Sequence, residues 1–499
     1  MSFLYHRTTN TRFSMRVASG ISALSMLLFA GCTVGPNYKR PVAEVPTTYK
    51  EVGDWKPAQP NEQNLGGNWW ELFQDPQLNA LELQVNVSNQ NLKAAEAQYT
   101  QARALVRYNR AAYYPTIDAG ASATRNRISD NRPPSLATNG VTYSDFQIPL
   151  ELSYEVDVWG RVRRTVESSR AQAQASAADL ATVNLSMHAQ LALDYFQART
   201  LDAEEQLLNS TVTQYQQALD LIESRFGGGL ASDVEVQQAR TQLETTRAEA
   251  IDVGVARAQY EHAVAVLIGK PPAEFSLAAL PLTAPPPAIP TGLPSELLER
   301  RPDIAAAERR MASANAQIGV AKAAYYPTIS LGAAGGFESG MLSTLFSGPS
   351  VLWSAGGSAV APLFDGGRRR ANLDQATAAY DQTVANYRQT VLTGFQQVED
   401  NVAALRILEN EAQVQDKAVT AAQKYLELAN TRYQGGVTSY LEVTTAESAA
   451  LSDEVTSVNI LGRRMMDAVL LVQALGGGWD SSALPEHPEC CGKLISASK

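Results

Sequence analysis

The sequence predicts a mainly α-helical protein with a membrane β-barrel, built from an internally duplicated helix–strand–strand–helix unit. The heptapeptide AAYYPTI occurs at residues 111–117 and again at 323–329, and RFGGGLASDVEVQQA from Arg225 matches RYQGGVTSYLEVTTA from Arg432. Long stretches without glycine or proline predict helices, and one stretch of alternating apolar and polar residues predicts a strand. The chain is therefore one unit written twice.

Composition and charge exclude several classes of function. With 499 residues and 45% hydrophobic residues, the chain is long enough for more than one folded domain. The net charge of −10, without a concentrated basic surface, argues against a nucleic-acid partner. Four histidines show no spacing typical of a metal site or a catalytic triad, so we expect no enzyme, metal or cofactor. Adjacent Cys490 and Cys491 near His487 form no usual ligand pattern, and we interpret them as part of a dispensable tail.

Residues 1–31 predict a lipoprotein signal peptide. Three arginines precede a 13-residue apolar stretch that is too short to span a bilayer, and Ala-Gly-Cys follows it. Phe-Ala-Gly-Cys resembles a bacterial lipoprotein signal, which makes Cys32 the expected lipidation site. Thr33 is not the aspartate associated with inner-membrane retention, so we expect the outer membrane. The alternative is an ordinary secretory signal with an incidental cysteine.

The mature chain divides into five parts. We expect an extended segment at 32–77, a first repeat at 78–270, a linker at 271–294, a second repeat at 295–476 and a tail at 477–499. The linker holds eight of the 24 prolines, which predicts an extended surface segment.

Each repeat centres on one very long predicted helix, at 161–226 and at 368–434, where only Gly394 interrupts the second. At about 1.5 Å per residue each would be about 100 Å long. Two shorter helices stacked end to end would match the long helix in length, as in the wall of a tube. The alternative is a fibrous coiled coil. The expected shorter helices are about 78–112 and 230–268 in the first repeat, and 295–324 and 437–475 in the second.

Each long helix ends in a glycine turn, which predicts a helical hairpin. A Ser-x-x-Glu element follows each turn at capping-box spacing. Neither turn carries the Gly-Lys-Ser/Thr ending of a phosphate-binding loop. The arginine before each turn is placed to bond to a neighbouring helix or a partner protein, or else is a solvated residue at a helix end. The tip residues singled out are Arg225, Gly228, Gly229, Ser232, Arg432, Gly435, Gly436 and Ser439.

Proline ends the helix after each tyrosine pair, and strands are predicted at 115–127, 143–158, 328–338 and 350–364. Between Phe146 and Val158 apolar residues alternate with polar ones, which fits a tilted membrane strand or a soluble sheet with one packed face. Four strands cannot close a barrel in lipid, so several chains must share one. Tyrosines at the helix–strand junctions would form an aromatic belt: Tyr113, Tyr114, Tyr325 and Tyr326.

A combination of short motifs covers the chain from Cys32 to about Trp479. The motifs are CTVGPNY from Cys32, WWELFQDP from Trp69, DVWGR from Asp157, RRPD from Arg300, FDGGR from Phe364, both copies of YYPT and both Arg-aromatic-x-Gly-Gly turns. Together they resemble the TolC-like outer-membrane efflux proteins, in the lipoprotein branch of the OprM/NodT type that serves RND-type tripartite pumps. The combination is specific, although each motif alone is weak.

This resemblance implies a homotrimer with a 12-stranded β-barrel in the outer membrane, continuous with a long α-helical barrel in the periplasm. It also implies a periplasmic adaptor protein at the helical tips, an inner-membrane RND-type pump and a passive duct without a cofactor. In the family, acidic side chains line a gate at the tip of the second hairpin. Glu442 matches one such position, whereas the second common acidic position falls on Thr445.

The expected function is therefore the exit duct of a tripartite efflux pump that exports small toxic compounds such as drugs, solvents or metal ions. Two alternatives are the duct of a type I protein-secretion system and a structural trimeric coiled-coil lipoprotein. The sequence does not identify the substrate, because a duct that binds nothing tightly has no substrate pocket.

Overall fold

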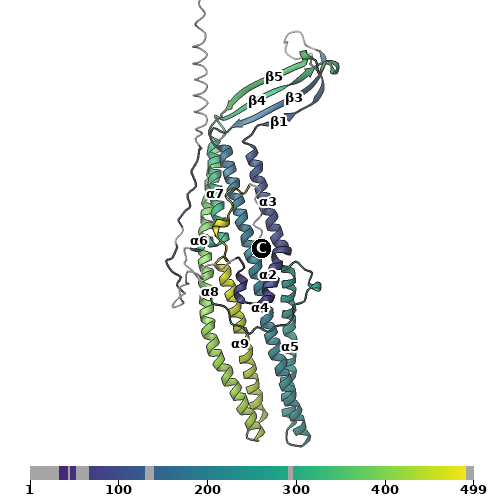
Figure 1. Ribbon diagram of the computed structural model, residues 1–499, viewed down its shortest axis with the longest axis vertical. Helices are drawn as coiled ribbons and strands as arrows, with labels where there is room; N and C mark the ends of the chain where they lie inside the picture. Colours follow the sequence, from purple (N-terminus) through teal and green to yellow (C-terminus); the bar gives the residue numbers. More distant parts are fainter. Residues whose placement is uncertain (1–32, 43–44, 52–66, 130–139, 290–295, 490–499) are drawn as a thin grey trace, which may run out of the picture.

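The computed structural model describes residues 33–42, 45–51, 67–129, 140–289 and 296–489. The predicted signal peptide, the lipidation site Cys32 and the cysteines Cys490 and Cys491 lie outside these residues. The molecule is elongated, with a sheet at one end of a long helical body (Figure 1). No helix in the described part of the chain combines the length and the apolar character needed to cross a membrane.

Two helices of 67 residues each run the length of the body, α4 (Arg161–Gly227) and α8 (Arg368–Gln434). Gly394, inside α8, lies against the guanidinium of Arg301, where a Cβ would be in ordinary contact at 3.4 Å from Nε. The helices α5 (Asp233–Leu267) and α9 (Tyr440–Ala474) return antiparallel to the lower halves of α4 and α8. Each repeat therefore contributes one long hairpin.

The helix that leads into each repeat is interrupted, contrary to the single helices expected at about 78–112 and 295–324. The first consists of α2 (Pro76–Ser88) and α3 (Gln90–Ala111), and the second of α6 (Leu297–Arg300) and α7 (Pro302–Ala323). Asn89 separates the first pair with extended backbone, and its side chain caps α3 by accepting a hydrogen bond from the amide of Leu92. Arg301 separates the second pair because the following Pro302 disfavours helical geometry at the preceding residue.

The two interruptions fasten the upper helices to the lower ones in the same way. Asn89 Nδ2 donates to the carbonyl oxygen of Leu267 at 2.8 Å, and Arg301 Nη1 donates to that of Ala474 at 2.9 Å. Leu267 and Ala474 are the last residues of α5 and α9. Each bond thus satisfies a carbonyl at a helix C-terminus and stacks α3 above α5 and α7 above α9.

A glycine completes each of these joints. Gly269 and Gly476 have φ of +70° and +94°, which favours glycine. A Cβ on Gly269 would lie 2.4 Å from the carbonyl oxygen of Ser88, and one on Gly476 would lie 2.1 Å from that of Arg300. Both joints therefore require a residue without a side chain.

The helices form one curved layer. In the upper half the packing order is α3, α4, α7 and α8, and in the lower half it is α5, α4, α9 and α8 (Figure 1). A large apolar core fills the middle of the body, and a second cluster joins the two hairpins at their lower ends. The outer edges of the layer are α8 on one side and α3 with α5 on the other.

The sheet is antiparallel and consists of β1 (Thr116–Ala119), β2 (Ser122–Arg127), β3 (Thr142–Val156), β4 (Thr328–Ser339) and β5 (Val351–Val360). Its order is β1-β3-β4-β5, and β2 continues β1 along β3. The strand expected at 115–127 is interrupted beside Pro149 of β3, which has no N–H to donate to the ladder. The last strand ends at Val360, before Pro362, rather than at 364.

The segments outside the repeats lie against the helices. The expected extended region at 32–77 contains a 3₁₀ helix at Trp69–Phe73, and the proline-rich linker contains one at Pro272–Glu274. The linker is held by α4, because the amide of Leu280 donates to Asp202 at 2.9 Å. In the tail, Glu489 is buried and binds Arg170 of α4 at 2.7 Å. The part of the tail up to Glu489 is therefore packed on the body.

Candidate functional site

The hairpin tips are tight turns that contain one left-handed residue each. Gly229 and Gly436 both have φ of +72°. Of the four tip glycines, Gly228 and Gly435 have φ of −86° and −75°, which any residue adopts. Each turn closes through backbone hydrogen bonds, among them the one from the amide of Leu230 to the carbonyl of Arg225 at 2.8 Å in the first hairpin.

The expected capping boxes form in one hairpin only. The Ser232 hydroxyl accepts from the amide of Glu235 at 3.4 Å, and the Glu235 carboxylate accepts from the amide of Ser232 at 2.7 Å. Ser439 makes no side-chain cap, contrary to the sequence prediction. The matching acid, Glu442, instead accepts a hydrogen bond from the hydroxyl of Thr438 and therefore does not bond back to Ser439.

Arginine side chains at the tips make contacts within and between the hairpins. The guanidinium of Arg225, on α4, lies 4.9 Å from the ring centre of Tyr433, on α8, in a cation–π contact. Arg432 instead approaches Glu442 within its own hairpin, with 3.6 Å between Nε and Oε1. Arg225 therefore links the two repeats, which the sequence could not show because the two residues are more than 200 positions apart.

The two candidate gate residues occupy the first turns of α9. Glu442 is a partly exposed carboxylate beside Arg432, and the Thr445 hydroxyl donates to the backbone carbonyl of Leu441 at 2.7 Å. Thr445 therefore supplies no charge, and Glu442 carries the acidic character at this level of the hairpin.

A groove separates α5 from α9 just above the tips. Its volume is about 450 Å³, and it combines exposed apolar side chains with amides and hydroxyls. The lining residues are Asp233, Val234, Gln237, Gln238, Thr241, Gln242, Leu441 and Thr444.

The register of the sheet places apolar side chains from β1, β3, β4 and β5 on one face. Leu152 pairs with Ile117 on one side and with Ala333 on the other, and Ala333 pairs with Ala355. Directly paired residues point to the same side of an antiparallel sheet. This apolar face is partly or fully exposed in the single chain and comprises Ile117, Phe146, Ile148, Leu150, Leu152, Tyr154, Val156, Ile329, Leu331, Phe337, Val351 and Trp353.

The opposite face of the sheet is polar. Ser153 pairs with Thr116, and Glu151 pairs with Asp118, so hydroxyls and carboxylates share that side. The sheet also has two free edges, because within the described chain β5 and β1/β2 are each paired on one side only. Both edges are therefore open to pairing with further strands.

The four junction tyrosines lie where the helices meet the sheet. The ring of Tyr326 stacks on Trp159 at 4.7 Å, and Trp159 donates from Nε1 to the carbonyl of Pro327 at 2.8 Å. The guanidinium of Arg369 lies 5.5 Å from the ring centre of Tyr325. Tyr114 is exposed, and Tyr113 is half-buried beside it. Trp159, which belongs to the DVWGR motif and is not among the predicted interface tyrosines, therefore also lies at this level.

The start of the described chain lies at the same level. A Cβ on Gly160 would lie 3.2 Å from Cα of Thr33, and the amide of Val34 donates to the carbonyl of Trp159 at 3.1 Å. Cys32 itself lies outside the described residues.

A buried acid and histidine fasten the start of the first repeat to α4. The Glu82 carboxyl lies 2.6 Å from Nδ1 of His188, whose Nε2 lies 3.1 Å from the amide oxygen of Asn86, and Trp70 stacks on the imidazole at 4.4 Å. Burial raises the pKa of Glu82 well above its usual value and lowers the pKa of His188 to about 4. Burial thus disfavours the charged form of both groups, and we interpret this pair as a packing contact.

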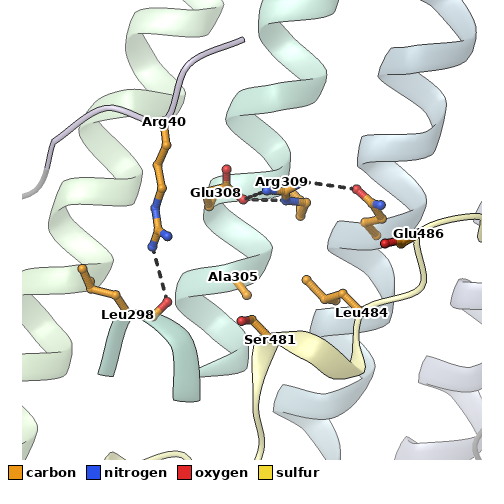
Figure 2. A pocket seen from close by; sticks show the side chains of 9 residues that line it. Arg40, Leu298, Ala305, Glu308, Arg309, Ser481, Leu484 and Glu486 are labelled. Atoms are coloured by element: carbon orange, nitrogen blue, oxygen red, sulfur yellow. Dashed lines mark hydrogen bonds and ion pairs between the residues drawn. The ribbon is translucent and has the colours of Figure 1, made fainter. Parts of the chain in front are cut away.

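A polar pocket of about 260 Å³ lies where the two ends of the chain approach each other on α7 (Figure 2). Arg40 of the N-terminal segment is on one side, and Ser481 and Leu484 of the C-terminal segment are on the other. Glu308 and Arg309, from α7, form an ion pair between them. The pocket thus follows from the docking of the two chain ends. Among the described residues no group of acidic, histidine and cysteine side chains could hold a metal ion.

Long hairpins beneath an edge-open sheet with one apolar face define a class of protein, the subunit of a channel that several chains complete together. A family model described as "Outer membrane efflux protein" matches residues 83–270 and 293–477. The chain belongs to this family of bacterial outer-membrane proteins.

Individual relatives agree over almost the whole length. The toluene efflux pump outer membrane protein TtgF of Pseudomonas putida is 34% identical over 92% of this chain and 96% of its own. The cation efflux system protein CusC of Escherichia coli is 31% identical over 91% of this chain and 97% of its own. The solved outer-membrane channel OprN matches with a TM-score of 0.84 at 31% identity, covering 90% of this chain and 100% of that one.

Proposed function

We propose that this protein is the exit duct of a tripartite efflux pump and that it carries small toxic compounds from the periplasm to the exterior. The observation that carries the proposal is the edge-open sheet with one apolar and one polar face, continuous with the long helical hairpins. The apolar face would contact lipid, and the polar face would line an aqueous lumen. The duct would be passive, without catalysis or a cofactor.

A homotrimer would complete the duct. The free edge β5 leads into α8, and the free edge β1 follows α3, so both layers have the same two open sides. Closing the ring would join β5 of one copy to β1/β2 of the next, and α8 of one copy to α3 and α5 of the next. Because β1 and β2 share one strand position, each copy contributes four strands, and three copies would give a 12-stranded barrel. Exposed apolar residues on both outer helices support this closure: Ile251, Val255 and Val266 on α5, and Leu392, Ile407, Val414 and Leu428 on α8.

The hairpin tips would receive a periplasmic adaptor protein, which connects the duct to an inner-membrane RND-type pump. The groove between α5 and α9 supports this docking site, because it presents Val234 and Leu441 beside polar amides. Three copies of Glu442 would form the acidic gate between the tips. A lipid on Cys32 would enter the inner surface of the outer membrane, because Thr33 lies beside Gly160 at the helix–sheet junction.

The relatives' names mention toluene and cations, which supports small toxic compounds as the substrate class and leaves the individual substrate open. The two alternatives, a type I secretion duct and a structural coiled-coil lipoprotein, make different demands. A structural lipoprotein would not conduct ions, and a secretion duct would recruit the inner-membrane transporter of a protein-export system.

The proposal is tested by reconstituting the purified full-length protein into planar bilayers and by cross-linking it in cells. We expect ion conductance from a trimer and recovery of an adaptor with an RND-type pump. A trimer that gives no conductance would overturn the duct. Recovery of a protein-secretion transporter instead of an RND-type pump would overturn the assignment to efflux.

A further inference from the structure

A carboxyl group without an ion-pair partner is buried between the two hairpins. Glu447, on α9, is 6% exposed, and no salt bridge involves it among the described residues. Its Oε2 atom is inaccessible to solvent and has no hydrogen-bond partner. Burying a charge without a partner is costly, so this position is unfavourable for an ionised glutamate.

Glu447 directly follows Ala446, a member of the apolar packing that joins the hairpins, here called the tip cluster. It draws residues from all four helices: Tyr215, Leu219 and Ile222 of α4, Val236, Ala239 and Leu243 of α5, Ala429 and Tyr433 of α8, and Tyr440, Val443 and Ala446 of α9. Tyr440 lies two turns before Glu447 on the same face of α9 and hydrogen-bonds to its carboxyl. The two hairpins cannot separate at this level without giving the carboxyl access to water.

The groups that face this carboxyl offer no opposite charge. From α4 comes Tyr215 and from α9 Tyr440, while α5 contributes the neutral amide of Gln242 near Tyr215. Charged groups near these rings are acids, Glu249 and Glu454 beside Tyr215. On α8, Tyr433 lies beside Glu235 and under the guanidinium of Arg225. Burial raises the pKa of Glu447 to about 7, and the hydrogen bond from Tyr440 offsets only part of that shift.

We propose that Glu447 is a proton-dependent positioning residue, which holds the α8–α9 hairpin against the α4–α5 hairpin when neutral and favours their separation when ionised. This inference rests on the proposed function, because separation of the hairpins would widen the periplasmic end of the duct. Glu447 is distinct from the gate acid Glu442, which is partly exposed and has its own cation, Arg432.

The direction of the effect follows from linkage. A carboxyl whose pKa is raised in the packed arrangement binds its proton more tightly there than in the separated one. The packed arrangement is therefore favoured at low pH. It becomes less stable relative to the separated arrangement as the pH rises towards about 7, and above that pH the ionised carboxyl destabilises it to the full extent. One linked proton changes the ratio of separated to packed hairpins by at most about tenfold per pH unit in each subunit.

The test uses the full-length trimer in planar bilayers between pH 5 and pH 8.5. We expect the open probability of the wild-type protein to rise between pH 5 and about pH 7 and to level off at higher pH. Glu447→Gln, which keeps the shape of the side chain without its charge, should stay at the low-pH level throughout. The matched control Glu427→Gln, at an exposed site on α8, should keep the wild-type profile.

A second variant pair checks that the hairpins move. Ser448 Oγ lies 3.4 Å from Gln242 Oε1, so cysteines at these positions, with Cys490 and Cys491 replaced by serine, can be joined between α9 and α5 by a thiol-reactive cross-linker that contains a cleavable disulfide. The cross-linked protein should lose the pH response, and cleavage of the cross-linker by a reductant should restore it. A wild-type profile in Glu447→Gln would overturn the inference, as would a pH response that survives cross-linking. Absence of conductance in the wild-type protein would instead count against the proposed duct.

Discussion

The guanidinium of Arg301 donates a 2.9 Å hydrogen bond to the carbonyl oxygen of Ala474, the last residue of α9. The same side chain binds Asp303 and Gln397 and lies over Gly394 of α8. One buried arginine therefore holds α7, α8 and α9 together in the second repeat. In the first repeat Asn89 makes the equivalent bond to Leu267 with a shorter, neutral side chain.

Replacing Arg301 with alanine should destabilise the helical body. A hydrogen bond to a charged group contributes about 1.5–3 kcal/mol, and this one also satisfies a helix-terminal carbonyl. We expect a lower melting temperature of the trimer. The control is Arg310→Ala, which removes an exposed ion pair to Asp179 worth about 0–1 kcal/mol. Equal melting temperatures for the two variants would contradict the role of Arg301.

The two glycines of the first hairpin turn should differ in their tolerance of a side chain. Gly229→Ala places a Cβ on a residue with φ of +72° and should cost about 1–2 kcal/mol locally. Gly228→Ala should cost less, because φ is −86° and the nearest atom is 3.6 Å from the new Cβ. Hydrogen exchange of the tip amides measures the difference, and faster exchange in both variants alike would argue against a left-handed requirement.

Charges on the two faces of β3 should have opposite consequences for assembly. Leu152→Arg places a charge on the face assigned to lipid, at a cost of about 2–4 kcal/mol near the bilayer midplane. Ser153→Arg points to the polar face and should cost little. Trimer yield in the outer-membrane fraction distinguishes the two variants. Similar yields would show that the faces are assigned wrongly.

Removing the gate acid should alter ion selectivity. Glu442→Ala deletes one carboxylate per subunit and leaves Arg432 without its partner, so the tip becomes more positive. We expect a reduced preference for cations in single-channel recordings of the trimer. Unchanged selectivity and conductance over a range of divalent cation concentration would place the constriction at another level.

The lipid on Cys32 should be dispensable for insertion if the barrel is the main anchor. Cys32→Ser behind a substitute cleavable signal should lose the acyl mass and still yield trimers in the outer membrane. Mass spectrometry and membrane fractionation measure both results. Accumulation of the variant as a soluble periplasmic protein would show that the strands do not insert without the lipid.

Local patterns in the sequence determined much of this protein. The repeat, the long helices, the glycine turns and the alternation along β3 depend on residues close together in the chain, so propensity and periodicity were sufficient to predict them. The repeated hairpin at Arg225 and Arg432 also located the tips, because glycine ends helices wherever it adopts a left-handed conformation.

Tertiary structure decided what depends on contacts between distant residues. The interruption at Asn89 serves a carbonyl 178 positions away, and the pairing of Arg225 with Tyr433 joins separate repeats. Ser439 shows the limit of local spacing, because Thr438 takes up the glutamate that the capping box would have used. Burial decided the chemistry of Glu447: the sequence shows one more acid on an amphipathic helix, and only the packing of four helices removes it from water.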